Sequence, residues 1–72
     1  MTDIDKHIGR QLRAARKEKR LTLAQVGAGI GVTLQNVAKY EAGSSRISAA
    51  RLYDLSMVLD VTPAFFYDGY GP

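Results

Sequence analysis

The sequence predicts an all-α protein, a compact bundle of five helices with a helix-turn-helix at its centre. One pattern occurs four times: an apolar residue, then Ser or Thr, then a second apolar residue five positions after the first. It is typical of a helix start, where the hydroxyl caps the helix and the two apolar side chains pack together. No segment alternates like a strand, and 72 residues without cysteine are most easily stabilised by local helical contacts.

The first two helices are expected at about residues 4–19 and 23–30 of one domain covering 1–72. The first has an apolar face with helical spacing, made of Ile4, Ile8, Leu12 and Ala15. The second begins after Thr22, which is followed three residues later by Gln25 and so predicts a capping box.

The third helix is expected at about residues 34–42, between a Thr33 cap and Gly43, where a left-handed conformation favours glycine. Only residues 31–33 separate it from the second helix. A connection this short predicts the bent helix-turn-helix arrangement. Within the second helix, Gly27 is expected at a close helix crossing and Gly29 is expected to face solvent.

The fourth and fifth helices are expected at about residues 49–59 and 63–67. Ser48 caps the fourth, and Thr62 caps the fifth. Pro63 suits the first position of a helix, where its missing N–H would have had no partner.

The charge is unevenly distributed. Residues 6–51 carry all ten Lys and Arg but only two acidic residues, a local sum of +8, whereas residues 52–72 carry −3. This pattern favours a polyanion on one face, although a solvated helix surface would look the same. His7 is the single histidine and cysteine is absent, so no metal site and no cofactor are expected. No apolar run could span a membrane and no secretory leader is apparent, which predicts a cytoplasmic protein.

An enzyme is not expected, because acid–base catalysis needs paired ionisable groups in a concave pocket and the acids here are mostly single. Asp3 and Asp5 are interpreted as favourable charges at the start of the first helix.

A gapless run of apolar, glycine and cap positions spans the second and third helices. It consists of Leu21, Thr22, Val26, Gly27, Ile30, Gly31, Val32, Thr33, Val37, Tyr40, Glu41 and Gly43. The likeness continues through Ile47, Ser48, Leu52, Leu55, Leu59, Val61 and Phe66. Over about residues 8–67, the chain therefore resembles the Cro and phage-repressor type of regulator, also called the xenobiotic-response-element family.

The resemblance implies a lambda-repressor-like fold and a bacterial or phage-encoded, nucleoid-associated regulator. Its function would be sequence-specific binding of double-stranded DNA, acting as a repressor, with the third helix in the major groove. The base-reading positions would be Leu34, Gln35, Ala38 and Lys39. Gln35 has the chemistry to pair with adenine, Lys39 could meet guanine or a phosphate, and Leu34 could touch a thymine methyl or be a plain surface residue.

The resemblance also implies phosphate contacts from the helix N-terminus and from the loop after the third helix. The candidate residues are Thr33, Asn36, Ser44, Ser45 and Arg46. Thr33 could be a plain cap instead, and Arg46 a solvated loop residue. Leu23 departs from the family, which often has a phosphate-binding glutamine at that position.

Two further sets of residues complete the expectation. In the family, an arginine of the first helix pairs with the position that Glu41 occupies here, and Arg16 matches that arginine. The resemblance therefore implies a structural salt bridge between Arg16 and Glu41. Several apolar residues near the C-terminal end exceed what the core needs and predict an interface: Met57, Phe65, Tyr67 and Tyr70. Because family members commonly bind as two-fold dimers, the resemblance implies a homodimer on a pseudo-palindromic operator. The four residues could instead cover the underside of the core. The alternative function is a protein-binding module of the same fold that has lost DNA binding.

Overall fold

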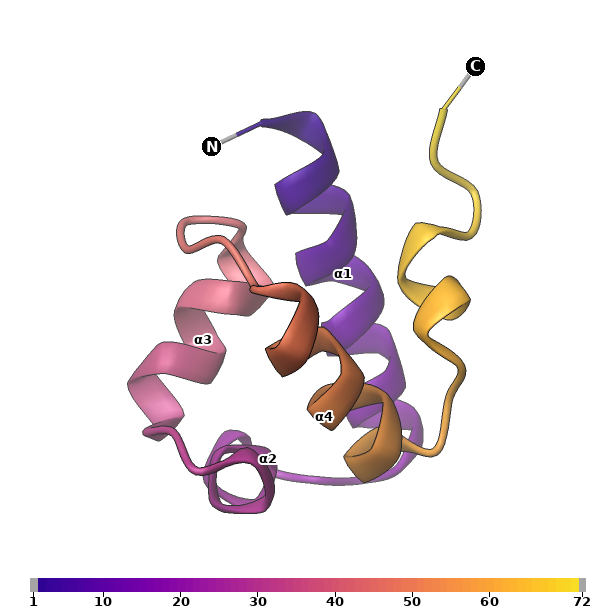
Figure 1. Ribbon diagram of the computed structural model, residues 1–72. Coiled ribbons are helices and arrows are strands. Elements are labelled where there is room, and N and C mark those ends of the chain that lie inside the picture. The colour runs from indigo at the N-terminus through magenta and orange to yellow at the C-terminus, as the bar shows by residue number, and fades with distance from the viewer. Residues whose placement is uncertain (1, 72) are drawn as a thin grey trace.

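The computed structural model describes residues 2–71, which form four α-helices and one short 3-10 helix (Figure 1). Their bounds are α1 Asp3–Glu18, α2 Leu23–Ile30, α3 Leu34–Ala42, α4 Ala49–Leu59 and η1 Pro63–Tyr67. The described residues contain no strand, so the all-α class is confirmed. The count of five α-helices is wrong, because the last element is a single tight 3-10 segment of five residues. Segments this short are where the 3-10 geometry is common.

The cap residues explain where the helices begin. Thr22 and Gln25 form the predicted capping box: the Thr22 hydroxyl accepts from Gln25 N at 3.1 Å, and Gln25 Oε1 accepts from Thr22 N at 2.8 Å. Thr33 and Ser48 each accept from the third backbone N–H of their helix, at 3.2 and 3.1 Å. Thr62 makes no such bond.

The tight turn between α2 and α3 depends on two glycines. Gly31 ends α2 with φ of 76°, a left-handed conformation that favours glycine. The chain then folds back over Gly27, where a Cβ would lie 2.6 Å from the Val32 carbonyl oxygen. The close approach at Gly27 is therefore to the turn itself. Gly29 is exposed, as expected. A Cβ there would nevertheless lie 2.9 Å from Val58 Cγ2, so the glycine also lets α2 approach α4 closely.

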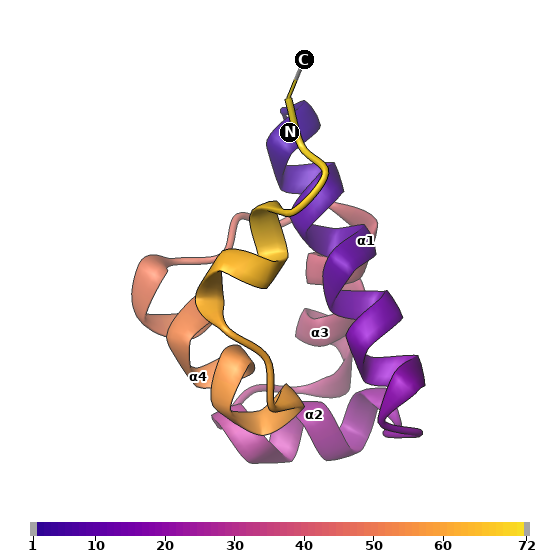
Figure 2. The same ribbon diagram turned by 90° about the vertical axis from the view of Figure 1, so that its right-hand side faces the viewer.

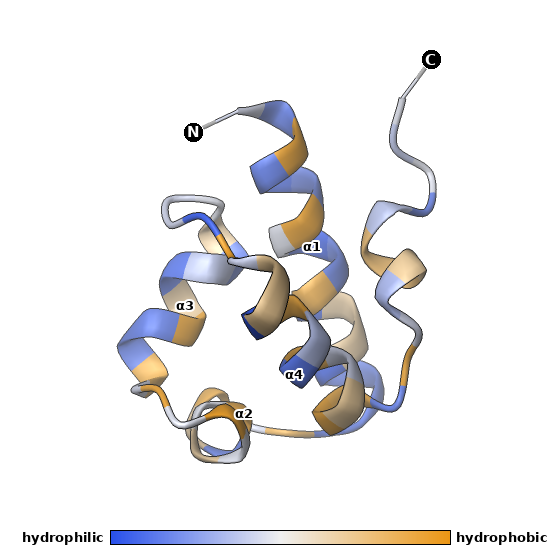
Figure 3. Cartoon of the chain, in the orientation of Figure 1, coloured by the Kyte–Doolittle hydropathy of each residue, from blue (hydrophilic) through white to orange (hydrophobic). Residues whose placement is uncertain are grey.

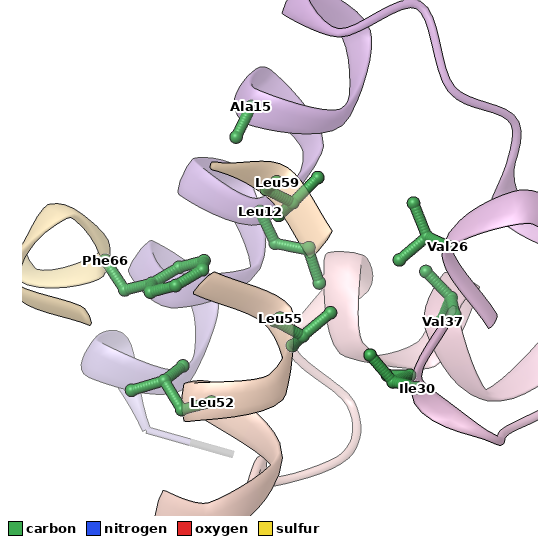
Figure 4. Packing of buried hydrophobic residues seen from close by; sticks show 9 residues of the cluster. All are labelled: Leu12, Ala15, Val26, Ile30, Val37, Leu52, Leu55, Leu59 and Phe66. Atoms are coloured by element: carbon green, nitrogen blue, oxygen red, sulfur yellow. The ribbon is translucent and has the colours of Figure 1, made fainter. Parts of the chain in front are cut away.

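The core is built from all five elements. In Figure 4 its side chains converge from the helices and from η1: Leu12, Ala15, Val26, Ile30, Val37, Leu52, Leu55, Leu59 and Phe66. Four of these are the second apolar residues of the four predicted helix starts, namely Val26, Val37, Leu52 and Phe66. Each such side chain, fully buried, stabilises the fold by about 1.5–3 kcal/mol. The helix-start pattern thus also marks much of the core.

The packing leaves one side of α3 uncovered within the described part of the chain. α1 packs against α3 on one side and η1 on the other, while α2 crosses beneath and contacts α3 and α4 (Figures 1 and 2). Much of α3 is hydrophilic, as its blue segments in Figure 3 show. The helix is therefore held from one side and presents its other side outward.

The segment that follows η1 is held on α1. Gln11 Nε2 donates to the Phe65 carbonyl at 2.9 Å, and His7 Nε2 donates to the Asp68 carbonyl at 2.7 Å. The Tyr70 ring lies against His7, with ring centroids 5.3 Å apart. Among residues 2–71, no three His, Cys, Asp or Glu side chains gather to hold a metal ion, and no helix is long and apolar enough to cross a membrane.

Candidate nucleic-acid interface

The outer side of α3 presents a mixed row of side chains. Gln35, Asn36 and Lys39 are exposed, and Leu34 is 44% exposed. Val37, on the opposite side, is fully buried. By helical spacing, Gln35 and Lys39 lie one turn apart and point away from Val37. Leu34 and Asn36 lie on opposite flanks of this outer side.

Ala38 differs from the other proposed base readers. It is half-buried and lines a shallow hollow of about 310 Å³ between α1, the start of α2 and α3. Leu23 and Arg13 also line this hollow, together with the charged pair described below. Ala38 thus lies at the edge of the outer side of α3, beside the first residue of α2.

The N-termini of α2 and α3 are both open to anions. Neither helix has an acidic residue in its first turn, so the partial positive charge of each terminus is uncompensated there. The Thr33 hydroxyl oxygen accepts from Asn36 N, which leaves the hydroxyl hydrogen available to an external acceptor. The cap role of Thr33 and a phosphate contact are therefore compatible.

Arg16 and Glu41 hold α3 on its scaffold. Arg16 Nε and Nη2 donate to the two Glu41 carboxylate oxygens at 2.5 and 3.0 Å, and Nη1 donates to the Leu21 carbonyl at 2.9 Å. The side chains are only 13% and 8% exposed. The hydrogen bond to Glu41 raises the pKa of Arg16 above its ordinary value, so the guanidinium stays charged. The structure thus brings together the two residues proposed as a salt bridge.

The three loop residues proposed for phosphate binding have different environments. The Ser44 hydroxyl donates to the Lys39 carbonyl at 3.3 Å, and Ser45 is half-buried. Arg46 is 66% exposed at the side chain and forms a salt bridge with Asp5, 3.2 Å from Nη2 to Oδ2. Arg46 is therefore not a free loop arginine.

The role of Asp5 is larger than the sequence suggested. Besides lying in the first turn of α1, its carboxylate accepts from Thr2 N and from the Thr2 hydroxyl, and it binds Arg46. The Thr2 hydroxyl bond, followed by the Arg46 bond, lowers the pKa of Asp5 to about 2. A Thr with an acid three residues later is the available sequence signal for the cap. The partner 41 residues away has no local signal.

Arg51 is a second residue without a predicted role. Its Nη1 donates to the Ile30 carbonyl at the C-terminal end of α2. This bond satisfies a carbonyl that the helix itself leaves without a partner. It also ties α4 to the helix-turn-helix.

The four residues proposed for the dimer interface differ in their solvent exposure. Met57 is 65% exposed, and Tyr67 and Tyr70 are 46% and 45% exposed. Phe65 is half-buried, packs against the core and makes an edge contact with Phe66 at 5.6 Å between ring centroids. This packing agrees with the alternative that Phe65 covers the underside of the core, and a dimer role for Phe65 stays a prediction. The other three remain exposed apolar surface.

Two short helices joined by a three-residue turn, the second uncovered on its outer side, define a helix-turn-helix protein. The helix-turn-helix family profile matches residues 12–66, and the chain belongs to this family.

Named relatives agree with this assignment. The chain is 42% identical over 65 residues to y4aM of Sinorhizobium fredii, described as an uncharacterised HTH-type transcriptional regulator. That match covers 90% of this chain and 46% of the relative. The chain spans about half the length of the curated relatives it matches.

Solved structures share the fold over nearly the whole chain. The restriction-modification controller protein C.AhdI from Aeromonas hydrophila has a TM-score of 0.81 at 26% identity, covering 89% of this chain and 96% of its own. The P22 c2 repressor, solved in complex with a synthetic operator, has a TM-score of 0.80 at 25% identity, covering 88% and 96%. The lambda-repressor-like fold is thus confirmed.

Proposed function

We propose that this chain binds double-stranded DNA sequence-specifically and serves as the DNA-binding part of a transcriptional repressor, not as an enzyme. The observation that carries the proposal is the uncovered side of α3, which offers Gln35 and Lys39 beside two helix N-termini without acidic residues. The P22 c2 repressor, which has the same fold, was solved with an operator, and this supports the proposal. α3 would lie in the major groove, whose width admits one α-helix.

The base contacts follow from side-chain chemistry. Gln35 would donate to adenine N7 and accept from N6, and Lys39 would donate to guanine O6 or N7. Leu34 would contact a thymine methyl. Ala38 lies at the edge of the outer side and has only a methyl group. It would therefore make only a van der Waals contact, with a base that lies directly against the helix.

The phosphate contacts would frame α3 at both ends. At its N-terminal end, the Thr33 hydroxyl, Asn36 and the free backbone N–H groups face outward. At its C-terminal end, the loop with Ser44, Ser45 and Arg46 follows. Contacts of this kind set the register of a protein on the duplex and supply much of its affinity.

The test is the salt dependence of binding to a selected duplex and to a scrambled one. We expect log affinity to fall with log salt at a slope of about −0.9 for each phosphate contacted, and the selected duplex to bind more tightly. Selection from a random DNA pool supplies the specific duplex. A flat salt response, or a pool that yields no preferred sequence, would contradict the proposal.

A second candidate is a protein-binding module of the same fold. It is favoured by Leu34, which is 44% exposed on the outer side of α3, and by the apolar Leu23 at the start of α2. Both positions would suit an apolar partner better than a phosphate. The salt titration separates the two functions, since apolar binding changes little with salt.

Two further features belong to the same proposal. The chain would act as a homodimer through Met57, Tyr67 and Tyr70, with two α3 helices about 34 Å apart on a pseudo-palindromic operator. Its place of action would be the nucleoid in the cytoplasm of a bacterial cell.

A further inference from the structure

The two side chains of the salt bridge between Asp5 and Arg46 differ strongly in solvent exposure. The Asp5 side chain is 7% exposed, whereas that of Arg46 is 66% exposed. Two bonds join them, from Arg46 Nε to Oδ1 at 3.3 Å and from Nη2 to Oδ2 at 3.2 Å. A buried anion thus holds one edge of a cation whose other parts face solvent.

The carboxylate is itself held in place. Asp5 Oδ2 accepts from Thr2 N at 3.0 Å and from the Thr2 hydroxyl at 2.7 Å. The loop lies directly on this turn of α1, because a Cβ at Gly43 would lie 2.8 Å from the Lys6 Cα. The orientation of the Arg46 guanidinium is therefore set by the backbone of α1 and not by the loop alone.

The remaining donors of Arg46 point away from Asp5. A guanidinium has five N–H groups, and the pair uses the Nε–H and one Nη2–H. Within residues 2–71, both Nη1 hydrogens and the second Nη2 hydrogen have no partner. A phosphate accepts two parallel bonds from such an edge, so Arg46 is able to bind Asp5 and a phosphate together.

We propose that Asp5 is a positioning residue for DNA binding: it fixes the Arg46 guanidinium beside the C-terminal end of α3, with its free edge presented to a backbone phosphate. The proposal rests on the proposed function. A long side chain that is already ordered loses less conformational freedom on binding, and so the contact is stronger. Simple electrostatics gives the opposite expectation, because an acid beside the interface repels phosphate.

Asp5→Asn separates the two expectations by sign. Asn keeps an oxygen for Thr2 N but loses the charge that holds Arg46. We expect its affinity for the selected duplex to fall by roughly 3- to 10-fold. Asp3→Asn is the matched control, because it removes the same charge from the exposed side of the same turn. It should bind as tightly as the unchanged chain or more tightly.

Dependence on Arg46 is tested in a second background. In Arg46→Ala, adding Asp5→Asn should cause no further loss of affinity. Arg46→Lys keeps the positive charge but loses the two hydrogen bonds from Nε and Nη2 to Asp5, so it should bind nearly as weakly as Arg46→Ala. This variant also tests the inference if Asp5→Asn does not fold. The inference is overturned if Asp5→Asn binds as tightly as Asp3→Asn, if its loss persists in Arg46→Ala, or if Arg46→Lys binds like the unchanged chain.

A measurement without DNA distinguishes failure of this inference from failure of the proposed function. The ¹⁵N relaxation of the Arg46 Nε–H reports whether the side chain is ordered. It should be ordered in the free chain and mobile in Asp5→Asn. Equal mobility in both would overturn the positioning role even if the chain binds DNA, whereas an ordered Arg46 in a chain that binds no DNA would refute the proposed function alone.

Discussion

Arg16 near the end of α1 and Glu41 near the end of α3 are joined by two hydrogen bonds between guanidinium and carboxylate, both almost out of solvent. An anion at a helix C-terminus is unfavourable by itself, because the carbonyl ends carry partial negative charge. The arginine removes this cost, and its third bond to the Leu21 carbonyl fixes the chain where it leaves α1. One side chain thus sets the relative position of α1, α2 and α3.

Removing either member of this pair should be costly. We expect Arg16→Ala and Glu41→Ala each to lower the free energy of unfolding by roughly 3–5 kcal/mol, because one buried charge is left unpaired. Urea denaturation of both variants and of the double variant measures the coupling. Lys19 and Asp60 form an exposed pair at 3.5 Å, and breaking it should cost at most about 1 kcal/mol. Additive losses at Arg16 and Glu41 would show that the pair is not coupled.

The contact between α1 and α3 should also be sensitive at Gly9. A Cβ there would collide with the backbone carbonyls of Tyr40 and Glu41, which cannot move without shifting α3. We expect Gly9→Ala to destabilise the fold by about 1–3 kcal/mol despite the better helix propensity of alanine. Gly29→Ala meets only the Val58 side chain and should cost less. Denaturant midpoints of the two variants compare them directly.

Local sequence signals predicted most of the fold. The caps of α2, α3 and α4 placed the starts of these helices as observed, because a cap acts within a single turn of chain. The apolar face of α1 placed its bounds within one residue of those observed. The 3-10 form of η1 was missed, since Thr62 and Pro63 mark a start equally well for either helix type. For Phe65 the sequence left surplus surface and coverage of the core as alternatives, because its burial depends on how η1 packs against α1.

The candidate site was less predictable than the fold. The outer side of α3 followed from helical spacing, and Arg16 with Glu41 followed from a family resemblance. The bonds from Arg46 to Asp5 and from Arg51 to Ile30 join residues that are distant in the chain. No composition or spacing rule identifies such partners, because a charged loop residue has many acids to choose from. The base and phosphate contacts stay predictions.

Asp5 should make stability depend on acid pH. Its pKa is about 2 in the folded chain against an ordinary 3.8, so its charge stabilises the fold above about pH 4. That stabilisation should be lost as the pH falls from about 4 to 2. Asp5→Asn should therefore melt below the unchanged chain at pH 6, with a difference that shrinks towards pH 2. A difference between the melting temperatures that stays constant over this range would contradict the assignment to Asp5.

Dimer formation is best tested at Met57. It is 65% exposed, so Met57→Glu should leave the monomer folded while weakening self-association and operator binding. Phe65→Glu should also reduce the melting temperature, because Phe65 packs on the core. Sedimentation and thermal melting distinguish the two effects. A chain that sediments as a monomer, free and on a single half-site alike, would rule out the proposed dimer.

Specificity and affinity should separate between Gln35 and Arg46. Gln35 is exposed one position into α3, where an amide is able to meet a base edge with two hydrogen bonds. Arg46 lies in the loop beyond α3 and presents only its free guanidinium edge. One side chain should therefore read sequence, and the other should contact the backbone that every sequence shares.

Gln35→Ala should weaken binding to the selected duplex by about 1–3 kcal/mol and leave binding to a scrambled duplex almost unchanged. Arg46→Ala should weaken both alike and reduce the salt slope by about one contact, because a phosphate contact releases its counterion whatever the sequence. Titration of each variant against both duplexes at three salt concentrations measures both effects. Equal loss on both duplexes for Gln35→Ala would mean that α3 does not read bases in this register.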